Sequence, residues 1–176
     1  MKINGVLLVK FYYISKKEKK QLLNTLRKLY PYIDISKVHG FEKIARVEMD
    51  KFVIIVIGTI PAFFYINEEG PYPLLLLLNT IKPEIPYVVV NEGAVRPIMR
   101  GADVMVPGII ELIDFQKNAI VGVMEPSKKA FIAVTRALMS SNEIKESNKG
   151  RALKTLHHAN DKLWKISLEL ARKLSI

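Results

Sequence analysis

The apolar and polar positions in the first half of the chain predict one strand, one helix and a series of short strands. Residues 6–12 are largely apolar and aromatic, which suits a strand, and the leucines from Leu22 to Leu29 recur at helical spacing. Ser15, with Glu18 three residues later, forms a capping box, so the helix is expected over Ser15–Tyr30. Further strands are expected at Lys43–Met49, Phe52–Ile57 and Ala62–Ile66, and a loop at Asn67–Pro71.

A proline-rich segment, Lys82–Pro86, is the best candidate for a domain boundary. Before it, the five consecutive leucines Leu74–Leu78 predict a buried helix over Pro73–Ile81. After it, short β patterns at close and even spacing suggest a small barrel without exposed sheet edges. Those strands are expected at Val88–Val90, Val104–Val106, Ile109–Asp114, Ala119–Met124 and Phe131–Leu138, with a basic helix at Ile166–Leu174. The expected domains are therefore residues 1–84 and 85–176.

The stretch from Pro86 to Gly108 predicts a strand, a short basic helix and a second strand in little over twenty residues. Arg96 and Arg100 are four apart on the expected helix, so both can point the same way and contact phosphate. Gly101 and Ala102 have almost no side chain, which lets another backbone, such as a ribose-phosphate chain, come close. The structural alternative is a compact turn with two solvated arginines.

Charge changes this picture by favouring a polyanionic partner. The 176 residues contain 27 Lys and Arg against 17 Asp and Glu, a net charge of +10 that divides equally between the two expected domains. Nucleic acid and an acidic membrane surface both fit this excess. Lys16, Lys17, Lys19 and Lys20 form a basic first turn that opposes the helix dipole, so they either serve a ligand or are solvated on an exposed face.

A second basic segment follows later in the chain, with Lys149, Arg151 and Lys154 around the flexible Gly150. Tyr87 and Trp164 could stack on bases, although a lone tryptophan near a chain end is more often a core anchor. The sequence pattern by itself leaves open whether the two basic segments meet in space.

No apolar run of the chain reaches the roughly 18 residues that span a bilayer.

Several kinds of catalytic chemistry are excluded or weakly supported. The chain has no cysteine. Ser140, His157 and Asp161 could form a triad only on paper, because no Gly-x-Ser-x-Gly elbow surrounds a serine. His157 and His158 with Asp161 have a metal-like composition, but adjacent histidines in a strand point to opposite faces. Phosphate-binding glycine motifs are absent as well. We therefore expect no catalytic residue, no metal and no cofactor.

Five sequence blocks carry a resemblance to a known family; they are Asn91–Val95, Gly101–Gly108, Val121–Met124, Ser147–Ala152 and Leu156–Trp164. They come in the same order as in a PUA domain, so the second half of the chain is similar to that domain. The last two blocks resemble the branch that contains the malignant T-cell amplified protein and the ligatin-type translation factor. Earlier in the chain, Glu69–Leu74 resembles the end of the pre-PUA domain that precedes the PUA domain in that branch.

The resemblance implies an α+β protein in which an N-terminal α/β pre-PUA domain precedes a C-terminal PUA β pseudo-barrel. It also implies that the chain binds structured RNA, either tRNA or rRNA, and acts in translation with the small ribosomal subunit or translation factors as partners. The residues it points to, together with Lys149 of the same basic segment, are Arg96, Arg100, Gly101, Ala102, Val104, Lys149, Arg151 and Lys154.

The same resemblance leaves two other roles open. A detached PUA protein also fits an RNA-binding accessory subunit of a tRNA- or rRNA-modifying enzyme, and Leu74–Leu78 could instead form a protein-docking surface. The composition, rich in lysine and lacking cysteine, is typical of an archaeal protein. We expect the protein in the cytoplasm, without a membrane partner.

Overall fold

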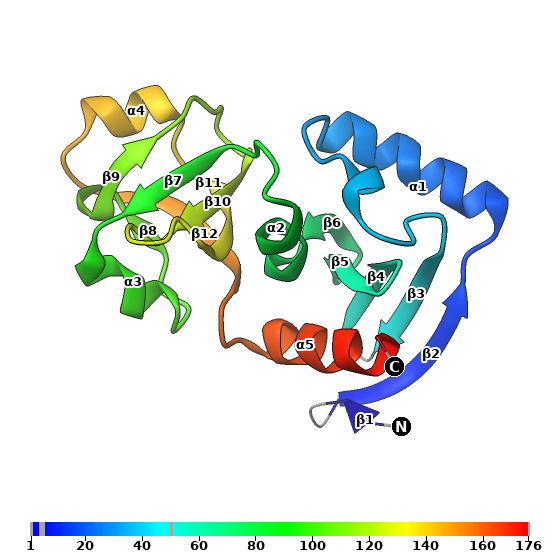
Figure 1. Ribbon diagram of the computed structural model, residues 1–176. Coiled ribbons are helices and arrows are strands. Elements are labelled where there is room, and N and C mark those ends of the chain that lie inside the picture. The colour runs from blue at the N-terminus through cyan, green and yellow to red at the C-terminus, as the bar shows by residue number, and fades with distance from the viewer. Residues whose placement is uncertain (1, 4–5, 50, 176) are drawn as a thin grey trace. The chain divides into compact units, whose positions relative to one another are not determined.

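The computed structural model describes residues 2–3, 6–49 and 51–175, and these form two compact units (Figure 1). Unit 1 contains residues 1–84 together with 165–176, and unit 2 contains residues 85–164. Residues 165–176 fall within the second expected domain, and in the structure they group with residues 1–84. This segment belongs to helix α5 (Lys162–Leu174), on which Ile166 and Leu170 are buried. An amphipathic pattern predicts a helix, but it does not say which core the apolar side covers.

Unit 1 is built on a sheet in which six antiparallel strands pair with their neighbours in chain order. The strands are β1 (Lys2–Ile3), β2 (Val6–Tyr13), β3 (Ile44–Met49), β4 (Phe52–Ile57), β5 (Ile60–Ile66) and β6 (Glu69–Pro73). The helices are α1 (Lys16–Leu29), the 3-10 turn η1 (Ile35–Lys37) and α2 (Leu75–Ile81). These elements confirm the three strands expected between Lys43 and Ile66. They also confirm the helices expected at Ser15–Tyr30 and Pro73–Ile81. Among the described residues no helix is long and apolar enough to cross a membrane.

The local signals of unit 1 act as expected, with one correction. The Ser15 hydroxyl accepts a hydrogen bond from the Glu18 N–H, and the Glu18 carboxylate accepts one from the Ser15 N–H, which begins α1. The loop expected over Asn67–Pro71 is wrong, because β6 already starts at Glu69. Asn67 and Glu68 have φ values of 49° and 67°, so these two residues make a tight hairpin turn.

Unit 2 curls a second six-stranded sheet, in the order β8-β12-β11-β10-β7-β9, into a nearly closed barrel. Its edge strands β8 and β9 are separated in the chain only by the 3-10 turn η2, so the two edges must lie close together. The pair β7 and β10 is parallel, and the other pairs are antiparallel. The elements are β7 (Tyr87–Val90), α3 (Glu92–Ile98), β8 (Val104–Met105), η2 (Val106–Gly108), β9 (Ile109–Leu112), β10 (Ile120–Met124), β11 (Phe131–Ala137), α4 (Ser141–Glu146) and β12 (Arg151–His158).

The interior of this barrel holds apolar residues from its strands and from α3. Val88, Ile98, Val104, Val123 and Leu153 are each at most 2% exposed and belong to one core cluster. The core thus includes a residue from α3 and residues from both β8 and β12. Packing of these side chains holds the short helix and the edge strand β8 against the barrel.

Candidate nucleic-acid interface

Helix α3 is positioned by a cap at its start and a turn at its end. The Asn91 carboxamide oxygen accepts a hydrogen bond from the Ala94 N–H at 3.0 Å. At the other end the Gly101 N–H donates to the Ile98 carbonyl and the Ala102 N–H to the Pro97 carbonyl, which is the pattern of a Schellman turn.

The end of α3 changes the expected place of one arginine. Arg96 lies inside the helix, but Arg100 lies in the turn beyond Ile98. The expectation that both arginines sit on the helix is therefore wrong, because the tight turn ends the regular helix first. Both side chains are nevertheless exposed.

Gly101 allows this turn to lie against strand β12. Its φ of +96° is in the left-handed region, where a side chain would be strained. A Cβ at this position would also come within 3.1 Å of Nε2 of His158. The His158 Nδ1 lies 3.1 Å from the Met99 carbonyl oxygen and 2.9 Å from that of Ala159. Since carbonyls only accept, Nδ1 carries the proton and donates, which ties the turn to the end of β12.

Asp103 makes the second connection between the turn and β12. One of its carboxylate oxygens accepts a hydrogen bond from the Thr155 N–H at 2.8 Å, and the other accepts from the Arg151 guanidinium at 3.1 Å. The Thr155 hydroxyl donates to the Ala102 carbonyl oxygen at 2.8 Å. These contacts join residues that are about fifty positions apart in the chain.

The pairing of β8 with β12 brings the two predicted basic segments together. Met105 is in register with Arg151, and Val104 with Leu153. We give the name turn surface to six exposed residues of these two segments, Arg96, Arg100, Gly101, Ala102, Lys149 and Arg151. Met105, which is in register with Arg151, is exposed as well. The surface carries four basic side chains, and Asp103 offsets one of them.

One residue expected in the site has a buried side chain. Val104 is 1% exposed in the barrel core, so only its backbone can face a ligand. Lys154 is exposed on β12, where it is in register with Arg136 of β11.

Asp103, Thr155 and His158 organise the turn and were not predicted from the sequence as site residues. Asp103 and His158 occur within the blocks that resemble a PUA domain, but their roles depend on contacts between distant segments. The available sequence signal for Asp103 was its position two residues after Gly101. That position does not identify the residues that Asp103 contacts.

His157 and Asp161, the pair with a metal-like composition, contact each other. The His157 side chain is buried, and its Nδ1 donates to the Asp161 carboxylate at 2.7 Å. Burial acts to raise the pKa of Asp161, but hydrogen bonds from His157 and from the Trp164 and His158 N–H groups outweigh it and hold that pKa below its ordinary value. Within the described ranges, no cluster of three or more metal-ligating side chains was found.

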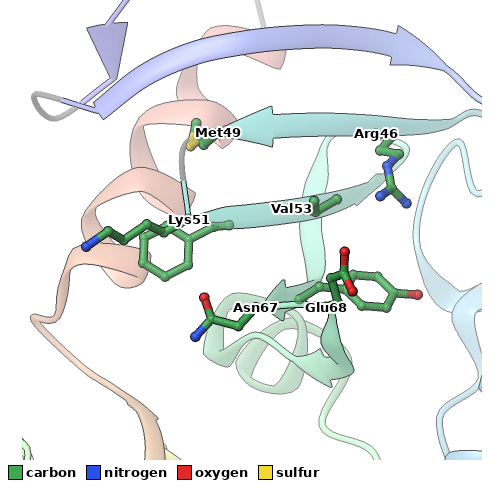
Figure 2. Close-up of a pocket in the computed structure, with 8 residues that line it drawn as sticks. Arg46, Met49, Lys51, Val53, Asn67 and Glu68 are labelled. Carbon is green, nitrogen blue, oxygen red and sulfur yellow. The ribbon is translucent and has the colours of Figure 1, made fainter.

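Unit 1 also has a hollow of about 480 Å³ beside β3, β4 and the turn after β5 (Figure 2). Arg46 lines it, and its guanidinium is 3.0 Å from the Glu48 carboxylate and 5.9 Å from the centre of the Tyr65 ring. Lys51 and Glu68 also line the hollow. Because acidic side chains balance the basic ones here, this hollow does not match a polyanion as the turn surface does.

Comparison with known proteins is consistent with this two-unit architecture. The sequence model of the PUA domain matches residues 86–159, and that of a domain of unknown function (DUF1947) matches residues 10–80. A conserved PUA domain protein from Thermoplasma acidophilum has a solved structure that superposes with a TM-score of 0.75 at 29% identity, covering 90% of this chain and 99% of that one.

Three curated relatives match most of the chain. An uncharacterized protein of Methanocaldococcus jannaschii is 36% identical over 157 residues, covering 88% of this chain and 95% of the relative. Translation machinery-associated protein 20 of Eremothecium gossypii is 31% identical, covering 68% and 69% of the two chains. The malignant T-cell-amplified sequence 1 homolog of Drosophila melanogaster is 30% identical and covers 86% of each. With a PUA domain in unit 2 and relatives that match more than two thirds of the chain, the chain belongs to the family of PUA-domain proteins that includes malignant T-cell-amplified sequence 1 and translation machinery-associated protein 20.

Proposed function

We propose that this protein is a non-catalytic RNA-binding protein of the translation machinery, which binds structured RNA, either tRNA or small-subunit rRNA, through the turn surface of unit 2. The observation that carries the proposal is the pairing of β8 with β12, which places Arg151 beside the Gly101–Asp103 turn. The net charge of +10 favours the same class of partner.

The chemistry of the turn surface suits an RNA backbone. Arg96 and Arg100 are exposed and can each contact phosphate through a planar guanidinium. Gly101 and Ala102 are also exposed and leave room for the sugar-phosphate chain to approach the protein backbone. Arg151 donates one hydrogen bond to Asp103, which orients a guanidinium that has five N–H donors.

Participation in translation is supported by a relative whose name places it in that machinery, translation machinery-associated protein 20. The other candidate role is an RNA-binding accessory subunit of a tRNA- or rRNA-modifying enzyme. Crosslinking the protein to RNA in cell extract and sequencing the bound RNA separates the two. Initiator tRNA or small-subunit rRNA supports translation, whereas recovery of modification guides or precursor RNA contradicts it.

Arg96→Ala combined with Arg100→Ala tests the surface itself. We expect the affinity for tRNA or small ribosomal subunits to fall about tenfold, and the salt dependence of binding to weaken by about two phosphate contacts. Lys117→Ala with Lys128→Ala removes the same charge from other exposed positions of unit 2 and is the matched control. Affinities that remain unchanged in gel-shift and sedimentation assays would contradict the proposal.

A further inference from the structure

Helix α1 of unit 1 carries a concentration of positive charge that the turn surface does not use. Six of its 14 residues are Lys or Arg and only one, Glu18, is acidic. The helix lies in unit 1, so these charges belong to a different part of the chain from the residues already discussed.

The charges are gathered along one side of the helix. A hollow of about 230 Å³ follows that side, and four of its six lining residues are basic and none is acidic. From Lys16 to Arg27 the helix rises about 16 Å, with Lys20 and Leu23 between them at the spacing that keeps side chains on one face. The lining residues are Lys16, Lys19, Lys20, Leu23, Asn24 and Arg27, and we call the four basic ones the helix stripe.

The single acid of the helix does not neutralise this stripe. Glu18 faces a different hollow, whose lining includes Arg46 and Tyr65 of the sheet. Its carboxylate is also bound in the capping box, and the hydrogen bonds from the Ser15 hydroxyl and the Ser15 N–H hold the pKa of Glu18 below its usual value. The negative charge is therefore present but turned toward the other side of α1.

Helix stability does not explain the basic first turn. Lys16 is the first residue of the helix, at the positive end of the helix dipole, where a basic side chain is unfavourable. Lys19 is held in place, because its ammonium donates to the Glu42 carbonyl oxygen at 2.7 Å. A hollow with four basic lining residues, no acidic one and one ammonium held by a hydrogen bond matches a chain of negative charges.

We infer that the helix stripe binds the phosphate backbone of RNA and gives the protein a second RNA contact, in unit 1. The contact is made to phosphates, so it is independent of base sequence and adds to affinity rather than to specificity. This inference rests on the proposed function, since it assumes that RNA is the partner of the whole chain.

The experiment compares two double variants of the full chain. Lys20→Ala with Arg27→Ala removes two stripe residues, and Lys17→Ala with Lys28→Ala removes two exposed charges of α1 that do not line the hollow. Alanine is the best helix former, so both variants keep the helix. We expect the stripe variant to bind tRNA about tenfold more weakly, with a salt slope lower by about two contacts, and the control variant to change much less.

The outcomes separate this inference from the proposed function when Arg96→Ala with Arg100→Ala is measured in parallel. If only the unit 2 variant loses affinity, or if the stripe and control variants lose it equally, the helix stripe is not an RNA site. If neither the unit 2 variant nor the stripe variant loses affinity, both the inference about the helix stripe and the proposed function are wrong. Unchanged tRNA binding with a selective loss of binding to phosphatidylserine vesicles would assign the stripe to a membrane surface and overturn the inference.

Discussion

The protein has two basic surfaces that are built in different ways. The helix stripe lies within twelve residues of one helix, from Lys16 to Arg27. The turn surface joins two segments, and the Arg151–Asp103 contact that connects them spans 48 positions in the chain. The first surface needs only a formed helix, whereas the second exists only when β8 pairs with β12.

The two surfaces also differ in how strongly contacts with other segments hold their geometry. On the helix stripe, Lys19 has a hydrogen bond to the backbone of another segment, and the geometry of the stripe is that of the helix itself. On the turn surface, Asp103, Thr155 and His158 hold the backbone of residues 99–103 in a defined conformation. Preorganised groups lose less entropy on binding. We therefore expect the turn surface to select the RNA and the helix stripe to strengthen its binding.

Asp161→Ala tests how strongly unit 2 depends on contacts between segments, and it should have the largest effect. The carboxylate accepts hydrogen bonds from the buried His157 ring and from the N–H groups of His158 and Trp164. The change removes a partly buried carboxylate that accepts three hydrogen bonds, so we expect the free energy of unfolding to fall by about 3 kcal/mol. Urea denaturation measures this free energy of unfolding. Asp114→Ala, which removes an exposed carboxylate paired with Lys145, is the control and should change little.

The same contact predicts a pH dependence. Because the folded-state pKa of Asp161 is below its ordinary value, the carboxylate stabilises the fold above the unfolded-state pKa of about 3.9 and loses that contribution as pH falls through the folded-state value. The stability difference between the natural protein and Asp161→Ala should therefore shrink below about pH 4. A difference that stays constant with falling pH would show that the ionised carboxylate is not the stabilising species.

Asp103→Ala distinguishes shape from charge on the turn surface and should have an intermediate effect. The change removes the acceptor of the Thr155 N–H, so we expect a loss of about 1.5 kcal/mol in the free energy of unfolding. It also removes a negative charge, which would raise RNA affinity if charge alone mattered. We expect affinity to fall instead, because Arg151 loses its orienting partner. Asp103→Asn keeps an acceptor for Thr155 and should be milder; tighter RNA binding by Asp103→Ala would refute the role of shape.

Ser15→Ala probes the local construction of the helix stripe and should have the smallest effect. The serine hydroxyl caps α1 by accepting from the Glu18 N–H at 3.2 Å. Loss of an N-cap costs about 1 kcal/mol, measured by thermal or urea unfolding. RNA affinity should remain the same, since the helix still forms within the folded unit. Restoration of stability by Ser15→Asp, another good N-cap residue, would confirm that capping is the cause.

Much of the fold follows from local patterns. The capping box at Ser15 and the leucine spacing place α1 within one residue of each observed end. The strand at Phe52–Ile57 has the expected bounds, because a continuous β-branched and aromatic run between turn residues has few alternatives. The strand β6 was missed, since Gly70 and Pro71 are turn residues by composition, and the strand that contains them pairs with β5 only in the folded sheet.

The candidate site was predictable in its residues but not in its contacts. Arg96, Gly101 and Arg151 could be named from their types and order. That Val104 is buried follows from the barrel, which turns its side chain into the core beside Leu153. The Asp103 contacts depend on the register of β8 against β12, and a register shift of one residue would move every side chain to the other face.

Local patterns and composition are enough to predict most helices and strands, the excess positive charge and the order of the family's blocks, because these depend on residue types and on neighbours in the chain. The register of β8 against β12, and the grouping of residues 165–176 with unit 1, depend instead on tertiary packing. Those outcomes depend on closing a sheet and on choosing a core for an amphipathic helix. Both are set by the packing of many distant side chains at once, which no short segment specifies.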